Sequence, residues 1–255
     1  MATQLKIMSF NMRLDAANDG INNFEFRKPR ILEYLREQKA DIIGFQEIRP
    51  TMRAWLVENF PEYYMVGIGR GKNYDDETSL IAFRKDKMAL ISCDTIMLSN
   101  CPTKFGSTYE ASGQSPCPRE YVRALIKHHD IAEPFYMYNV HTDYASPIPR
   151  ILASAQMLQD ITAHDKKFFL SGDFNAVPGT TEINMLTECT VRGIKDATDG
   201  MDPTCHLFGT VKPEKIDYIF CDADTPVLEA VRFDDVPVDG VYVSDHNPIY
   251  IIAEL

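Results

Sequence analysis

The chain has 255 residues, and its 26 lysine and arginine residues against 37 aspartate and glutamate residues give a formal net charge of −11 at pH 7. This length is near the upper end of what one hydrophobic core supports, so we expect a single domain over residues 1–255. Proteins that gain affinity by broadly neutralising nucleic-acid phosphates carry the opposite charge. A nucleic-acid substrate would need a local basic patch or a metal ion, whereas a small phosphorylated substrate would need less.

Cysteine spacing and hydropathy bear on the location of the protein. The six cysteines are scattered, without the closely spaced pair that zinc sites use, which favours free thiols in a reducing compartment. The first residues show no cationic segment followed by an apolar stretch, and no apolar run reaches the roughly 18 residues that a membrane span needs. We expect a cytoplasmic monomer without a membrane span.

Short runs rich in Ile, Val, Phe and Tyr recur along the chain and end at Gly, Pro, Asn or Asp, which is typical of β-strands. Two longer segments show helical periodicity instead, and Thr51 and Thr181 are predicted N-caps of two shorter helices. In chain order the predicted elements are a strand at 5–10, a helix at 26–38, a strand at 41–45, the Thr51 helix, strands at 63–68, 79–83, 89–98, 121–127 and 135–140, a helix at 151–163, a strand at 167–170, the Thr181 helix, and strands at 216–220 and 249–253.

The order of these elements predicts mixed sheets. Strict alternation of strand and helix would imply a doubly wound parallel sheet, but no helix separates the predicted strands between residues 63 and 98. Helices outside a mixed arrangement fit better. Residues 99–119 form a long polar segment rich in Ser, Pro and Gly, and loops of this length in compact domains are usually functional or disordered.

Most of the chemically interesting side chains directly follow an apolar run. They are Asn11 after residues 7–10, Gln46 and Glu47 after 42–45, His141 and Asp143 after 136–140, and Asp173 and Asn175 after 168–170. Asp217 lies inside a predicted strand, where a buried carboxylate must be paired or hydrogen-bonded. Asp245 and His246 precede the last strand, and an acid beside an imidazole can hold a metal ion and a phosphate oxygen together. If the strand ends converge, these groups meet in one cleft.

Each of these residues also has a purely structural interpretation. Gly172 and Asp173 could form a tight turn, Glu47 could cap a helix, and His141 could be a hydrogen-bonded residue at a strand end. His206 is ambiguous, because it could contact a substrate from the loop before Asp217 but has no matching pair for a zinc site. The joint order of the acids, amides and imidazoles favours a functional site.

That ordered set, Asn11, Glu47, His141, Asp173 with Asn175, Asp217, and Asp245 with His246, resembles the endonuclease/exonuclease/phosphatase superfamily from Ser9 to Pro248. The superfamily contains metal-dependent phosphoesterases such as pancreatic-type deoxyribonucleases, abasic-site endonucleases, inositol-polyphosphate 5-phosphatases, sphingomyelinases and deadenylases. The resemblance implies an α/β fold, a four-layered α/β/β/α sandwich of two packed mixed sheets with helices outside. It also implies a site at one end of the sandwich.

The resemblance further implies a divalent cation, Mg²⁺ or Mn²⁺, in that site. Glu47 would be its main ligand with Asn11 beside it, and Asp245 would join that coordination or a second metal position. Carboxylate and amide oxygens with water suit Mg²⁺, which keeps part of its hydration shell.

The catalytic and substrate-binding roles follow by the same resemblance. Asp173 would orient or deprotonate the attacking water, while Asn175 would donate its amide to a phosphate oxygen. His246 would contact the phosphate and be held in orientation by Asp217. The remaining assignments are His141 as a second imidazole, Glu77 as its carboxylate partner, and Arg119 as a contact of the substrate phosphate.

The leading hypothesis is therefore a metal-dependent phosphoesterase that cleaves the ester of a phosphorylated small molecule by in-line attack of water. A Mg²⁺-dependent nuclease acting on DNA or RNA is the alternative, and a catalytically silent phosphate-binding module is the second. In abasic-site endonucleases a lysine commonly follows the glutamate closely, whereas here Ile48, Arg49 and Pro50 follow Glu47, which weakens a repair function. The segment from Ser9 to Asp15 resembles small bacterial hydrolases of unassigned substrate.

Overall fold

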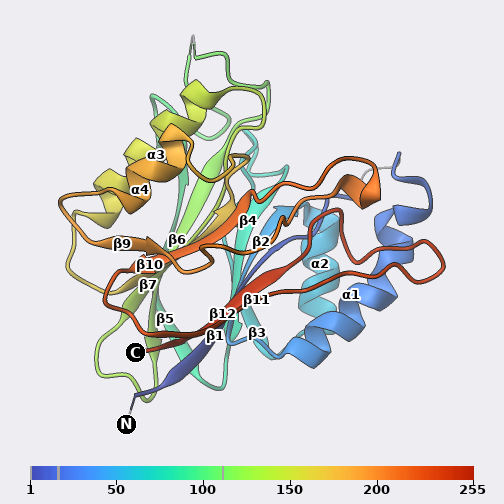
Figure 1. Ribbon diagram of the computed structural model, residues 1–255, viewed down its shortest axis with the longest axis horizontal. Coiled ribbons are helices and arrows are strands. Elements are labelled where there is room, and N and C mark those ends of the chain that lie inside the picture. Colours follow the sequence, from blue (N-terminus) through green and yellow to red (C-terminus); the bar gives the residue numbers. More distant parts are fainter. Residues whose placement is uncertain (1, 16–17, 111) are drawn as a thin grey trace.

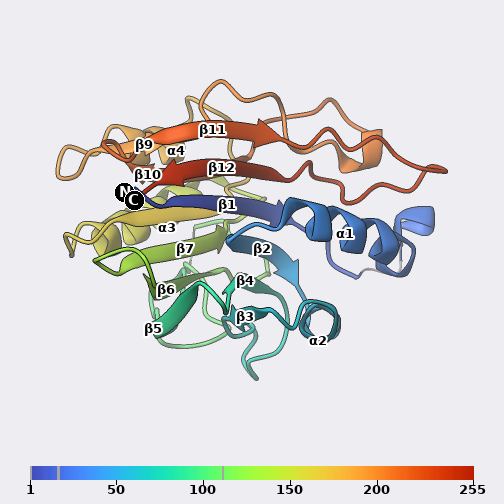
Figure 2. The same cartoon turned by 90° about the horizontal axis from the view of Figure 1, so that it is seen from below.

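Two six-stranded mixed sheets pack face to face and carry helices on their outer faces (Figures 1 and 2). The computed structural model describes residues 2–15, 18–110 and 112–255. The helices of this part are α1 (Phe24–Gln38), α2 (Pro50–Asn59), α3 (Pro147–Ile161) and α4 (Thr181–Thr187), with short 3-10 turns at Gly20–Asn22 and Leu207–Gly209. The strands are β1 (Gln4–Asn11), β2 (Ile42–Ile48), β3 (Tyr63–Val66), β4 (Thr78–Arg84), β5 (Met88–Met97), β6 (Glu120–His128), β7 (Phe135–His141), β8 (Phe168–Asp173), β9 (Ile194–Asp196), β10 (Asp217–Asp222), β11 (Val227–Arg232) and β12 (Ile249–Glu254).

Each sheet contains one parallel pair at its centre and antiparallel pairs around it. The first sheet has the order β11-β12-β1-β2-β4-β3, with β1 parallel to β2. The second has the order β5-β6-β7-β8-β10-β9, with β7 parallel to β8. Helices α1 and α2 cover one flank of the molecule and α3 and α4 the other, with both sheets between them (Figure 1). The expected four-layered sandwich is confirmed.

Alternating side chains explain why this order of layers buries three separate cores. In β1, Leu5 and Ile7 belong to the core between the two sheets, whereas Met8 and Phe10 belong to the core under α1 and α2. A third core packs α3 and α4 against the other sheet and includes Leu170 of β8. A strand that is apolar on both faces can lie only between two layers, so the nearly continuous apolar runs of these strands favour a sandwich.

A buried polar bridge joins the two sheets near the ends of their parallel strands. The Nδ2 of Asn139 in β7 donates to the carbonyl oxygens of Phe45 (2.7 Å) and Leu80 (3.0 Å) in the opposite sheet. Its Oδ1 accepts from Gln46 Nε2 (2.6 Å) and from Ser171 Oγ (3.1 Å). Because unpaired polar groups are costly in a core, these bonds hold the two sheets in one relative position.

The predicted elements agree with the structure except at some ends and edges. Helix α2 begins at Pro50 after Arg49, so the prediction of Thr51 as its N-cap is wrong. The cap of α4 is Thr180, one residue before the predicted Thr181. Edge strands β9 and β11 were not predicted, because β9 has three residues and β11 is mostly exposed. No helix in the described ranges is long and apolar enough to cross a membrane.

Candidate active site

The polar side chains singled out by the sequence meet at one edge of the two sheets. The parallel strands β1, β2, β7 and β8 end at this edge, and their antiparallel neighbours β4, β6, β10 and β12 begin there. The two chain termini lie at the opposite end, where Thr3 and Leu255 exchange backbone hydrogen bonds (Figure 1). The topology therefore gathers residues from eight strands around one place.

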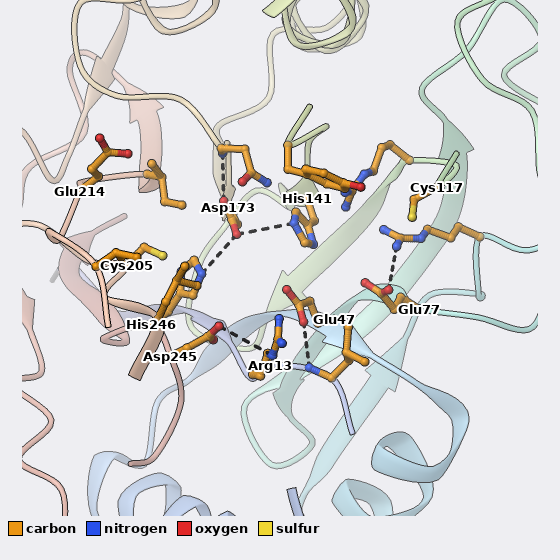
Figure 3. A pocket seen from close by; sticks show the side chains of 18 of the residues that line it. Arg13, Glu47, Glu77, Cys117, His141, Asp173, Cys205, Glu214, Asp245 and His246 are labelled. Carbon is orange, nitrogen blue, oxygen red and sulfur yellow. Dashed lines mark hydrogen bonds and ion pairs between the residues drawn. The ribbon is translucent and has the colours of Figure 1, made fainter. Parts of the chain in front are cut away.

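A cavity of about 520 Å³ opens at this edge (Figure 3). Its volume lies in the range of sites for small molecules. Eight of the predicted site residues line it, namely Glu47, Glu77, Arg119, His141, Asp173, Asn175, Asp245 and His246. The other two, Asn11 and Asp217, are buried behind this lining and are hydrogen-bonded to it.

Glu47 occupies a strained backbone position. Its φ is 63°, in the left-handed region, and the pairing of β2 with β4 shifts register between Phe45 and Ile48. Such a conformation costs about 1 to 3 kcal/mol and is found where a bulge redirects a functional side chain. The carboxylate is fixed from both sides, because Oε1 accepts from Asn11 Nδ2 (3.1 Å) and Oε2 accepts from the backbone N–H of Leu14 (2.8 Å).

Asp245 supplies a second carboxylate, which is buried, near the half-buried Glu47. Burial, and then the negative charge of Glu47, raise the pKa of Asp245 above its ordinary value. The only cation in salt-bridge distance of Asp245 in the described ranges is Arg13, whose Nε is 3.8 Å from Oδ2. The two carboxylates are hard oxygen donors of the kind that bind a divalent cation, and Asn11 faces Glu47 through Nδ2 while its Oδ1 accepts from the backbone N–H of Arg13 (2.9 Å).

Asp173 lies at the centre of the site. Its Oδ2 accepts from Asn11 Nδ2 (2.9 Å), and its Oδ1 accepts from the backbone N–H of Asn175 (2.9 Å). Two imidazoles approach the same Oδ2, His141 Nε2 at 3.6 Å and His246 Nε2 at 3.7 Å (Figure 3). Burial raises the pKa of Asp173 to about 7, an effect that His246 partly offsets. A carboxylate with this pKa can accept a proton near neutral pH.

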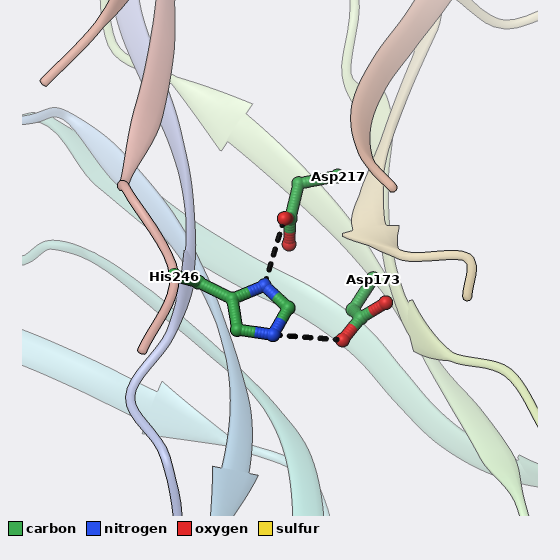
Figure 4. Close-up of side chains that lie close together, drawn as sticks. All are labelled: Asp173, Asp217 and His246. Atoms are coloured by element: carbon green, nitrogen blue, oxygen red, sulfur yellow. Dashed lines mark hydrogen bonds and ion pairs between the residues drawn. The ribbon is translucent and has the colours of Figure 1, made fainter. Parts of the chain in front are cut away.

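His246 is held by Asp217 as a charged imidazolium (Figure 4). Its Nδ1 lies 2.8 Å from Asp217 Oδ2, and the same oxygen accepts from Thr204 Oγ1 at 2.5 Å. Burial alone would lower the pKa of His246, but the charge of Asp217 and its hydrogen bond raise it well above the ordinary value. The Nε2 of a protonated ring points a donor toward Asp173 and the cavity.

Asp173, Asp217 and His246 also come close enough to ligate a metal, since their ligand atoms lie within 4.8 Å of one another. We assign them to hydrogen bonding instead. Asp217 Oδ2 already binds the His246 ring and the Thr204 hydroxyl, and a protonated imidazole has no lone pair for a metal. The carboxylates of Glu47 and Asp245 are less committed, because Glu47 accepts only from neutral donors and Arg13 Nε lies 3.8 Å from Asp245.

His141 is the second imidazole, but its environment is the opposite of that of His246. Burial, and then the cations Arg119 and Arg70, lower the pKa of His141 well below the ordinary value, so the ring is neutral. The expected carboxylate partner is elsewhere. Glu77 Oε1 pairs with Arg70 Nη2 at 2.8 Å, and no hydrogen bond or ion pair joins Glu77 to His141 in the described ranges. Nδ1 of His141 is buried without an acceptor or donor there.

We expect the substitution His141→Gln to change how stability depends on pH. Below pH 6.5 the unfolded chain takes up a proton at His141 that the folded protein excludes. The folded wild type therefore loses about 1.4 kcal/mol per pH unit between 6.5 and the lowered pKa. Urea unfolding should show that, from pH 7 to pH 5, the free energy of unfolding falls less in the variant than in the wild type. The control is His129→Gln, because His129 is exposed. If the free energy of unfolding depends on pH in the same way in His141→Gln and in the wild type, His141 is not neutral in the folded protein.

The residues predicted to contact the substrate phosphate differ in whether their donor groups are already hydrogen-bonded within the protein. Asn175 has a left-handed φ of 47°, and its Nδ2 donates to the carbonyl oxygen of Thr142 at 3.2 Å. Arg119 is buried, and within the part of the chain that the structure describes its Nε and Nη1 form no hydrogen bond. His206 does not line the cavity, because its Nδ1 accepts from the backbone N–H of Gly209 (3.2 Å) and its ring packs on Tyr242. It caps the turn at Leu207–Gly209.

Three residues at the site were not predicted from the sequence. Thr204 braces Asp217, Arg70 pairs with Glu77, and Arg13 approaches Asp245. Arg13 was visible as the second residue after Asn11, and its left-handed φ of 52° turns the chain at the end of β1. Thr204 and Arg70 have no local signal, because each lies in a loop and acts on a residue of another segment.

Comparison with known proteins agrees with this geometry. The model of the endonuclease/exonuclease/phosphatase family matches residues 8–246. No curated protein sequence shows a significant match. The structure is similar to that of an endonuclease/exonuclease/phosphatase from Bacteroides vulgatus, with a TM-score of 0.92 and 27% identity over 99% of each chain.

Two more distant structures share the fold. One is a mannosyl-6-phosphatase from Bacteroides thetaiotaomicron, with a TM-score of 0.87 and 22% identity over 98% of this chain and 99% of that one. The other is D. rerio TDP2 in complex with a single-strand DNA product, with a TM-score of 0.74 and 18% identity over 98% and 99%. Because the family match spans nearly the whole chain and includes the strand ends that build the cavity, the protein belongs to the endonuclease/exonuclease/phosphatase family.

Proposed function

We propose that the protein is a divalent-metal-dependent phosphoesterase that hydrolyses a small phosphorylated substrate by in-line attack of water. One observation carries this proposal. Asp173, with a pKa of about 7, lies between a charged and a neutral imidazole in a cavity of small-molecule size. A proton acceptor beside a fixed cationic donor is what the hydrolysis of a phosphate ester needs.

The residues around Glu47 fit a divalent cation. Glu47 and Asp245 offer two carboxylates, and the Asn11 amide lies between Glu47 and Asp173. The two carboxylates bind through oxygen, which favours Mg²⁺ or Mn²⁺ over softer metals, whereas the Asn11 oxygen accepts from the backbone N–H of Arg13 (2.9 Å). When bound there, such an ion would neutralise the charge that develops on the phosphate oxygens.

The remaining chemistry belongs to the side chains of the protein. Asp173 would accept the proton of the attacking water, and its own orientation is set by Asn11 and the Asn175 backbone. His246, fixed by Asp217, would donate from Nε2 to a phosphate oxygen. Arg119 and the Asn175 amide would provide further donors to the substrate, and neutral His141 would complete the polar wall around Asp173.

Charge favours a small substrate over a nucleic acid. The net charge of −11 opposes binding to a polyanion over a wide surface. A nuclease remains the alternative, since the single-strand DNA complex of D. rerio TDP2 has the same fold. A silent binding module would show a lost site position, yet all ten predicted site residues are present at or behind the cavity.

All six cysteines are free, which supports a cytoplasmic location.

A substrate panel tests the proposed function. Purified protein with Mg²⁺ or Mn²⁺ should release phosphate from at least one class among sugar, nucleotide and lipid phosphoesters. Plasmid and single-stranded DNA should remain intact under the same conditions. Turnover of DNA alone would favour the nuclease, and turnover of no phosphoester with either metal would refute the hydrolase.

Metal binding can be tested separately from activity with Glu47→Gln. Loss of one carboxylate ligand should weaken Mn²⁺ binding, as measured by calorimetry. The expected loss is at least about 10- to 100-fold, because removing a group that only orients a metal ligand already reduces affinity by that factor. Folding should survive, because the single glutamine oxygen can still accept from the backbone N–H of Leu14, and Asn11 Nδ2 keeps Asp173 as an acceptor. Exposed Glu58→Gln in α2 is the control. Equal Mn²⁺ affinity of wild type and Glu47→Gln would place the metal elsewhere.

A further inference from the structure

Arg119 is a buried cation without a hydrogen bond at Nε or Nη1. Its residue is 3% exposed, and these two nitrogens have no acceptor in the described ranges. The carboxylate in salt-bridge distance is Asp143, whose Oδ2 lies 3.9 Å from Nε. That oxygen already accepts from the backbone N–H (3.1 Å) and the hydroxyl (2.5 Å) of Ser115. A buried guanidinium whose N–H groups lack acceptors destabilises the fold unless a ligand supplies those acceptors.

A second buried guanidinium lines the same part of the cavity. Arg70 is 2% exposed, and its Nη2 pairs with Glu77 Oε1 at 2.8 Å, while its Nε has no acceptor in the described ranges. Burial, and then the charge of Arg70, lower the pKa of Arg119, so the two cations repel one another. An oxyanion between them would relieve this repulsion and supply the missing acceptors.

The carboxylates nearby do not remove the need for an anion. Burial raises the pKa of Glu77 to about 7, and burial also raises the pKa of Glu120. Glu120 Oε1 accepts from the backbone N–H of Ser79 at 2.6 Å, and its Oε2 has no partner in the described ranges. Both acids therefore carry less negative charge at neutral pH than two surface glutamates would.

The guanidinium pair is displaced from the centre of the chemistry. Figure 3 shows Glu77 and Cys117 at one end of the cavity, and Cys205 and Glu214 at the other, on the side of His246. His141 and Glu47 lie between these ends (Figure 3). Since Arg70 binds Glu77 and Arg119 is two residues from Cys117, both cations belong to the end away from His246.

We propose that Arg70 and Arg119 form a second anion-binding subsite, which holds an oxyanion of the substrate other than the phosphate that is cleaved. The proposal rests on the proposed function and names the substrate class as small phosphate esters that carry a second phosphate or a carboxylate. A cavity of about 520 Å³ has room for both groups on one molecule.

Binding of non-hydrolysable probes tests the subsite without turnover. The probes are propylphosphonate, with one anionic group, 3-phosphonopropionate, with a carboxylate added, and propane-1,3- and hexane-1,6-diphosphonate, with a second phosphonate at two spacings. Calorimetry in the presence of Mn²⁺ gives each dissociation constant. At least one two-anion probe should bind the wild type about 10-fold or more tightly than propylphosphonate. If the carboxylate probe binds best, the second anionic group of the substrate is a carboxylate; if a diphosphonate binds best, it is a phosphate.

The variant Arg119→Gln should reduce that affinity ratio to between about 1 and 2, and Arg70→Lys should lower it while keeping Glu77 paired. The matched control is Arg123→Gln in β6, the strand that begins directly after Arg119. Arg123 is bound to Asp94 (2.7 Å) and Asp160 (2.5 Å) outside the cavity, so this variant should leave the ratio unchanged. A wild-type ratio near 1, or an equal loss for one-anion and two-anion probes in Arg119→Gln, would overturn the subsite.

Thermal unfolding provides a second measurement. Arg119→Gln removes a buried cation whose Nε and Nη1 have no hydrogen bond in the described ranges, and it should keep or raise Tm, as expected for a residue that serves binding at the expense of stability. A clear fall in Tm would count against the subsite, because it would show that Arg119 supports the fold. The two proposals fail separately: a protein that hydrolyses no phosphoester but keeps the Arg119-dependent ratio refutes only the hydrolase, and hydrolysis without that ratio refutes only the subsite.

Discussion

The substitution Asp173→Asn should lower kcat by about 10²- to 10⁴-fold, the usual contribution of a general base. The asparagine keeps the size of the side chain, its single oxygen can still accept from the backbone N–H of Asn175, and Asn11 Nδ2 keeps Glu47 as an acceptor, but the amide cannot accept the proton of water. The expected loss is therefore in kcat rather than in folding. It is measured by steady-state kinetics with Mg²⁺ on the phosphoester that the panel identifies.

Thermal unfolding of the same variant separates chemistry from stability. Burial raises the pKa of Asp173, so ionisation of this carboxyl group lowers the stability of the folded protein. A neutral amide avoids this cost, and Tm should stay equal or rise while kcat falls. Exposed Asp165→Asn serves as the control for both measurements. A kcat within about threefold of the wild-type value would exclude Asp173 as the base.

The substitution Asp217→Asn should lower kcat by up to about 10⁴-fold, the loss seen when the aspartate that orients a catalytic histidine is replaced in serine proteases. Asp217 Oδ2 binds His246 Nδ1 at 2.8 Å and holds the ring protonated by its charge. With an amide in this place, the pKa of His246 should fall and the cavity would lose its fixed cation.

The control for this substitution lies on the same strand. Asp222→Asn changes an aspartate at the other end of β10, where the carboxylate pairs with Arg192 at 2.6 Å, and should leave kcat unchanged. NMR titration of the His246 ring distinguishes an electrostatic role of Asp217 from a structural one. If the pKa of His246 is the same in wild type and Asp217→Asn, the proposed charge state of the ring is wrong.

Residues at strand ends could be found from the sequence because the signal is local. An apolar run that stops near Asn11, Glu47, His141 or Asp173 marks both a strand and its end. Local pattern could not show that Glu47 has a left-handed φ, since a bulge depends on the pairing of β2 with β4. The fold class followed from the resemblance, whereas the element order alone led only to mixed sheets with helices outside.

Partners across the fold were harder to predict than the residues themselves. The resemblance suggested Glu77 as the carboxylate of His141, but the structure pairs Glu77 with Arg70. Thr204 and Asn139 are buried and bond to residues of other elements, and neither has a neighbour in the chain that signals its role. Such pairings depend on which segments the two sheets bring together.

Residue patterns were enough to predict the strands other than β9 and β11, the two long helices and the ordered set of acids, amides and imidazoles, because alternation and apolar length are properties of neighbouring residues. The charges of that set depend on contacts made in the folded protein. His246 is charged and His141 neutral although both are buried histidines, since one contacts Asp217 and the other lies near Arg119 and Arg70. A pKa depends on burial and on charges a few ångströms away, and those neighbours come from strands far apart in the chain.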